Sequence, residues 1–222
     1  MSKKSKLKKT PRPPAAPVAS DPVPVSTNGE DKIPAQLPVL PLVDLVLFPG
    51  MIVPLIINNA RSAKMIDETA TASRFFLGTL ARDPSVSDEK AGWNDLHEVG
   101  CVGRLLKLLK FPDETTRVLV QGVVRARMTA PAAESPYIIT HFHSLADDTE
   151  STIEISALAR KASESFQEII TLSPTLPDEL KIAVLNTEEP GKLADLIAAN
   201  LNMPLEERQQ LIEDTSPKGR LT

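Results

Sequence analysis

The feature that most constrains the fold is the apolar, proline-rich run LPVLPLVDLVLFPGMIVPL at residues 37–55. It carries a single charge, Asp44, and is long enough to cross a lipid bilayer as a helix. It also contains four prolines, and each removes a backbone donor that a helix in lipid has no water to replace. Short strands joined by a turn accommodate these residues better. The run therefore predicts buried β structure with a proline-rich corner, and it argues against a membrane span.

Three of these prolines can be placed where no backbone hydrogen bond is lost. Pro41 and Pro54 are expected at strand edges or bulges, where a missing N–H does not interrupt a ladder. Residues 48–50, Phe-Pro-Gly, are expected to form the turn between the two apolar arms. Such a turn cannot bury every side chain, so part of the corner should face solvent.

The next part of the chain shows strand patterns around one helix. Asn58 or Asn59 can cap a helix that runs to about Ser73. Apolar and polar residues alternate over 115–128, which predicts a strand with one buried face. Further strands are expected at 75–81, 96–111 and 137–145, with a polar loop over 82–95. We predict one small, mostly β domain over residues 37–148.

Small residues in these strands indicate a tightly curled sheet. The alternation over 115–128 places Arg117 and Arg125 on the face opposite the core. The face assigned to the core consists of Val118, Val120, Gly122, Val124 and Ala126. Bends or bulges are expected at Gly100, Gly103 and Gly122.

The pattern changes to helical spacing at residue 149. Apolar residues recur at helical intervals until Pro174, and Ser151–Glu154 fit a capping box at the start of this helix. Three more helices are expected to begin at Pro177, Pro190 and Pro204, because proline suits the first turn of a helix. We predict a small helical bundle over residues 149–222.

The last residues indicate the start of another helix. Ser216 suits an N-cap and Pro217 a first helical position, but the sequence stops at Thr222. We interpret the chain as a fragment truncated at the start of a linker helix. The alternative is a native C-terminus whose last helix frays.

Residues 1–36 differ from the rest in composition and charge. They are proline-rich and carry seven lysine and arginine residues against three acidic ones, so we expect a disordered basic arm. A tether to nucleic acid is the alternative, and salt-sensitive binding would reveal it. The arm's charge is +4 and the whole chain's is −4, so the remainder carries −8. This acidic body, with only 4% aromatic residues, disfavours nucleic-acid binding.

No sequence motif for catalysis or metal binding is present. The chain lacks a phosphate loop, a GxSxG elbow, an HExxH helix and a CxxC pair. His141 and His143 could share a metal, but no pattern places a cysteine or carboxylate beside them, which favours two half-exposed strand histidines. Cys101 is expected to pack among small apolar neighbours, and a single cysteine fits a reducing compartment. We expect no catalytic residue, metal or cofactor in this chain.

Several segments in order resemble the N-terminal domain of ATP-dependent Lon proteases. These are the opening run at 37–55, Arg61-Ser62, DLHEVGCVGRLLKLLKFPD, VLVQGVVRARM, and EEPGKLADLIAANLNMPLEERQQLIE in the helical part. The resemblance covers about residues 36–222, everything except the arm.

The resemblance implies an α+β fold, with a small PUA-like β pseudo-barrel followed by an α-helical bundle. It implies a cytoplasmic substrate-recognition and assembly region that captures unfolded, damaged or tagged proteins. In the family, a long helix leads on to an ATPase module and a serine–lysine protease domain, both absent here, so ATP and Mg²⁺ are expected only there. The parent would be a hexamer. The alternative is a stand-alone Lon-type domain acting as a protein-interaction adaptor.

Two residues depart from the family pattern. Val43 stands where the family commonly has arginine, so any role of that charge is lost or moved. Glu114 stands where a glycine is usual in the turn of the β hairpin, so that hairpin is expected to be wider or strained.

A surface that captures unfolded proteins should be apolar and exposed, because unfolded chains expose apolar side chains. We predict the substrate-binding residues at the corner: Phe48, Pro49, Met51 and Ile52. Methionine suits promiscuous contacts because its side chain is flexible and polarizable. The alternative is that these side chains plug the barrel. Met51→Asp is expected to weaken binding to a denatured client.

Overall fold

The computed structural model describes residues 32–83, 85–87, 89–111, 115–148 and 152–222. The strands are β1 (Gln36–Leu42), β2 (Ile52–Ile57), β3 (Phe75–Leu80), β4 (Val99–Lys110), β5 (Thr116–Ala133) and β6 (Ile139–Ser144). The helices are α1 (Ala60–Thr71), a 3₁₀ turn η1 (Trp93–Asp95), α2 (Ile153–Leu172), α3 (Glu179–Leu185), α4 (Pro190–Asn200), α5 (Leu205–Glu213) and α6 (Pro217–Arg220). The predicted α+β class is confirmed.

Strands β1, β3, β4, β5 and β6 close into a barrel, and β2 pairs with the outer part of β5. The order in the sheet is β2-β5-β4-β3-β1-β6, and β6 also pairs with β5, which closes the barrel. Among the strand pairs of the described residues, β1–β3 alone is parallel. Among the described strands β2 pairs with β5 alone, so the other edge of β2 lies open. Pro54 lies in the edge strand β2, as predicted, whereas Pro41 lies in β1, between β3 and β6 in the sheet but beyond the residues that pair with β6.

Glycines allow two of the strands to pack closely against their neighbours. A Cβ atom on Gly122 would lie 2.0 Å from the carbonyl oxygen of Phe48, and one on Gly103 would overlap the Phe76 ring at 2.4 Å. The β4–β5 pairing also shifts register between Val102 and Gly103. The expected irregularity is therefore present there, and close packing is its physical reason.

The local cap signals predicted most helix starts, with three differences. Asn59 caps α1 by accepting a 2.7 Å hydrogen bond from the Ser62 N–H, and Ser216 caps α6. The N-cap of α2 is Thr152, whereas the expected box began one residue earlier. α3 begins at Glu179, two residues after Pro177, since the chain first makes a separate turn. α5 begins at Leu205, because Pro204 is its N-cap. The arm up to residue 31 and Glu114 lie outside the described residues.

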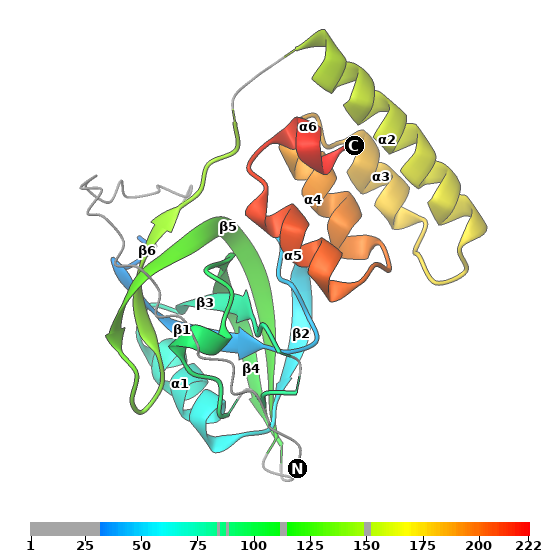
Figure 1. Cartoon of the computed structure of the whole chain (residues 1–222). Helices are drawn as coiled ribbons and strands as arrows, with labels where there is room; N and C mark the ends of the chain where they lie inside the picture. Colours follow the sequence, from blue (N-terminus) through cyan, green and yellow to red (C-terminus); the bar gives the residue numbers. More distant parts are fainter. Residues whose placement is uncertain (1–31, 84, 88, 112–114, 149–151) are drawn as a thin grey trace, which may run out of the picture.

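The helices α2 to α6 gather at one end of the barrel, with α5 nearest the strands (Figure 1). The Gln209 side chain of α5 is buried and donates a 3.0 Å hydrogen bond to the carbonyl oxygen of Val99 in β4. A shared apolar cluster joins the two parts; it consists of Val46, Phe48, Leu80, Ala198 and Ile212. No helix within the described ranges is long and apolar enough to span a membrane.

A buried group of four charges also joins the barrel to the helices. Arg125 of β5 binds both carboxylate oxygens of Asp195 in α4, one of them at 2.8 Å. Arg220 of α6 contacts Asp195 at 2.7 Å and Asp147, from the segment after β6, at 2.6 Å. Both arginines and Asp195 are almost fully buried. A Cβ atom on Gly191 would lie 1.9 Å from the Asp147 carboxylate, so the glycine lets α4 approach.

Candidate functional site

The corner between β1 and β2 is held against β5 by backbone hydrogen bonds. The Gly50 N–H donates to the carbonyl of Gly122 at 2.9 Å, and the Gly122 N–H donates to that of Met51 at 2.8 Å. The Met51 N–H closes the turn on the carbonyl of Phe48 at 3.1 Å. Gly50 has φ +80°, a conformation that favours glycine. The corner is therefore a rigid loop.

The structure separates the four predicted corner residues. The Phe48 side chain is 0% exposed and belongs to the apolar cluster between barrel and helices, so it packs rather than presenting a surface. Pro49 and Met51 are half-buried. Ile52 is 56% exposed. The corner is therefore divided into a buried residue, Phe48, and an exposed one, Ile52.

Pro49, Met51 and Ile52 form the apolar wall of a groove of about 450 Å³. The opposite wall comes from α3, α4 and the segment between them; the contributing residues are Ala183, Thr187, Lys192, Leu196, Ala199 and Asn200. The ammonium group of Lys192 lies 2.6 Å from the Glu189 carboxylate, so its charge is paired. We call this the interdomain groove.

Two further apolar side chains of α3 are exposed outside the interdomain groove. Ile182 and Leu185 are 63% and 66% exposed, while Ala183 between them lines the groove. The sequence reasoning placed no site on these helices. One signal was present: the short segment 179–185 has five apolar residues, more than one buried face of two turns requires.

The remaining candidate chemical groups lie apart from this groove. The His141 ring nitrogen lies 3.1 Å from the Gln36 side-chain nitrogen on the neighbouring strand. Within the described ranges, no three histidine, cysteine or acidic side chains form a group that could hold a metal ion. Cys101 is fully buried.

Burial raises the pKa of the Cys101 thiol to about 12 from its ordinary value of 9.0. The folded protein therefore keeps this proton between pH 9 and 12, whereas the unfolded chain releases it. We expect the contribution of Cys101 to stability to be complete below pH 9 and to fall as the pH rises toward 12. Its labelling by a disulfide reagent at pH 8 should be at least about a hundredfold slower in the folded than in the denatured protein. Rapid labelling of the folded protein would contradict this assignment.

The fold and groove define a class of protein: a β barrel with docked helices whose open apolar surface lies between the two parts. The sequence model described as "ATP-dependent protease La (LON) substrate-binding domain" matches residues 36–222. The chain belongs to this family.

The relatives agree with this assignment. The chain is 40% identical over 198 residues to a Lon protease of Roseiflexus castenholzii, and 34% identical over 194 residues to one of Dictyoglomus thermophilum. These alignments cover 89% and 87% of this chain but 24% of each relative, so the chain spans about a quarter of their length.

Two solved structures share the fold. The N-terminal domain of the Mycobacterium avium complex Lon protease matches with a TM-score of 0.66 at 21% identity, covering 84% of this chain and 94% of that one. A Lon N-terminal domain protein from Xanthomonas campestris matches with a TM-score of 0.59 at 17% identity, with the same coverage of 84% and 94%.

Proposed function

We propose that this chain is the substrate-recognition region of an ATP-dependent Lon protease and captures unfolded, damaged or tagged proteins for degradation. The observation that carries the proposal is the interdomain groove, whose barrel wall holds the exposed Ile52 beside the half-buried Pro49 and Met51. Exposed apolar side chains in a concave surface suit a ligand whose own apolar side chains are exposed.

The proposal extends to the parent protein. There, this region would sit on a cytoplasmic hexamer and contribute to its assembly, with ATP and Mg²⁺ bound by a separate ATPase domain. Each groove would hold a client weakly, and six grooves on one ring would raise the overall affinity through local concentration.

Ile52→Asp is expected to weaken binding of an unfolded client about tenfold, because a carboxylate would be desolvated against an apolar ligand. Ile52 is a sharper test than Met51, since Met51 also packs against two core clusters and its replacement by aspartate would disturb folding. The measurement is the Kd for reduced, carboxymethylated α-lactalbumin, with native α-lactalbumin as the folded counterpart.

The matched control is Ile153→Asp, which makes the same change at a side chain that is 92% exposed in the first turn of α2. An acidic residue is tolerated there because it lies at the positive end of the helix dipole. This variant should bind the client like the unchanged chain. Equal affinities for all three proteins would remove the interdomain groove as the client site.

A further inference from the structure

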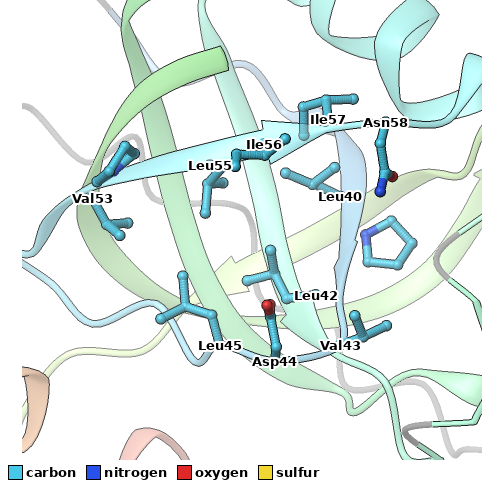
Figure 2. Close-up of a pocket in the computed structure, with 12 residues that line it drawn as sticks. Leu40, Leu42, Val43, Asp44, Leu45, Val53, Leu55, Ile56, Ile57 and Asn58 are labelled. Atoms are coloured by element: carbon cyan, nitrogen blue, oxygen red, sulfur yellow. The ribbon is translucent and has the colours of Figure 1, made fainter. Parts of the chain in front are cut away.

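A second groove, of about 410 Å³, lies between β1 and β2 (Figure 2). Leu40 and Leu42 of β1 and Leu55 of β2 project into the space between the strands. Leu40 and Leu42 are buried, so they form the floor, while Leu55 is half-buried. We call this the strand-edge groove. It begins along β2 where the barrel wall of the interdomain groove ends, after Ile52.

The β2 side of this groove is an unpaired strand edge. Hydrogen-bonded residues alternate along an antiparallel pair, and the Gly122 N–H of β5 donates to the carbonyl of Met51. The alternation therefore directs the backbone groups of Val53, Leu55 and Ile57 toward β5. The backbone groups of the alternate residues Ile52, Pro54 and Ile56 are directed toward the open edge.

The β1 side presents an acceptor to the same space. The Leu42 carbonyl accepts a 2.7 Å hydrogen bond from the N–H of Ala81, the residue after β3, so Leu42 faces β3. Its neighbour Pro41 faces the other way and lines the groove. Pro41 and Pro54 supply carbonyl oxygens but no N–H. The two edges consequently offer more acceptors than donors.

Of the described residues that line the strand-edge groove, Asp44 alone is charged, and it is exposed. Within the described part of the chain, no hydrogen bond or ion pair engages its carboxylate. A carboxylate is also an acceptor. Backbone and side chains thus favour the same kind of ligand, one that donates hydrogen bonds and carries positive charge.

We propose that the strand-edge groove binds one extended segment of the client polypeptide, which adds to β2 as a further strand and places a lysine or arginine near Asp44. This inference rests on the proposed function and adds how the client is held. An extended chain supplies N–H donors at every second residue and apolar side chains at the same spacing. The six residues of β2 give the site a length of about 20 Å.

The two prolines explain why such an edge can remain open. A continuous edge of donors and acceptors would template aggregation, and proline on an edge strand suppresses it. Here the missing donors leave a short ladder, so binding stays weak and reversible. Exposed and half-buried residues alternate along β2. Every second side chain of the client can therefore enter the groove, while those between them contact Ile52 and Ile56.

The test uses the full chain and a fluorescein-labelled decapeptide of alternating valine and threonine with one central lysine. Two N-methylated versions remove the backbone donors of either the odd or the even residues. The donors that pair with β2 all belong to one set, and from the other set at most one can reach the Pro41 carbonyl. One version should therefore lose at least about tenfold in affinity and the other clearly less. Since the protein is unchanged, a folding defect cannot affect the comparison.

Two protein variants locate the peptide. Asp44→Lys should reverse the preference between the lysine peptide and its glutamate counterpart, each changing by about threefold. Ile56→Pro removes a donor at the open edge and should weaken the parent peptide further than Ile56→Ala, which removes only the side chain. Circular dichroism checks that each variant is folded.

The outcomes separate the two proposals. Equal losses for both N-methylated peptides, with client binding still sensitive to Ile52→Asp, would overturn strand addition and leave the proposed function standing. A chain that binds neither peptide nor unfolded α-lactalbumin would overturn both. Self-association that competes with the peptide and is abolished by Ile56→Pro would make a second copy the occupant, and would likewise overturn this inference.

Discussion

Replacing Asp195 by asparagine is expected to lower the free energy of unfolding by about 3–5 kcal/mol. The substitution keeps the shape of the side chain but removes the charge that Arg125 and Arg220 share. Both guanidinium groups are almost fully buried, at 3% and 1% side-chain exposure, and Asp147, at 34%, would be their remaining anion. Two buried cations with one partly solvated partner are poorly compensated.

The measurement is urea denaturation followed by circular dichroism. Asp178→Asn is the matched control, because Asp178 is 83% exposed and pairs with Lys181 within a single turn. Exposed pairs of this kind contribute about 0–1 kcal/mol. If Asp195→Asn cost no more than this control, water would have to replace the missing charge, and the cluster could not be a rigid joint.

Phe48→Ala is expected to cost about 3–5 kcal/mol, the range for truncating a buried phenylalanine. The ring is 0% exposed and lies between Leu80 of the barrel and the helical residues Ala198 and Ile212. The surrounding backbone cannot readily collapse into the cavity, because Gly50 and Met51 hold the corner against β5. The loss should appear in the same denaturation measurement.

The control for Phe48→Ala is Ile52→Ala, which truncates a side chain four residues further along the same corner. Because Ile52 is 56% exposed, its truncation should cost less than about 1 kcal/mol. A similar cost for both variants would contradict the division of the corner into a packing residue and a surface residue.

Elements set by local interactions could be predicted from the sequence. Asn59, Pro190 and Ser216 act on the few residues that follow them, so their positions located the starts of α1, α4 and α6. Pro41 and Pro54 restrict their own strands in the same local way. The order of strands and helices followed from such signals.

Interactions between distant segments could not be predicted in this way. Arg125 was assigned with Arg117 to the outer face of β5, yet it is buried. Its carboxylate partner Asp195 is 70 residues away, and no periodicity in either segment connects them. Phe48 was expected at the surface corner for a similar reason, since only the docked helices bury it. The predicted corner residues therefore form one wall of the interdomain groove, and the other wall, formed by the helices, was not predicted from the sequence.

The four-charge cluster also determines how the molecule would transmit mechanical load. Arg220 of α6 is tied to Asp195 of α4, and Asp195 is tied to Arg125 in the barrel wall. A pull on α6 is therefore passed directly to β5, bypassing the segment between β6 and α2. Charged contacts at 2.6–2.8 Å resist sliding of the two parts past each other, so the barrel and the helices should move as one rigid unit. Anything held along β2, which pairs with the same β5 strand, would move with it.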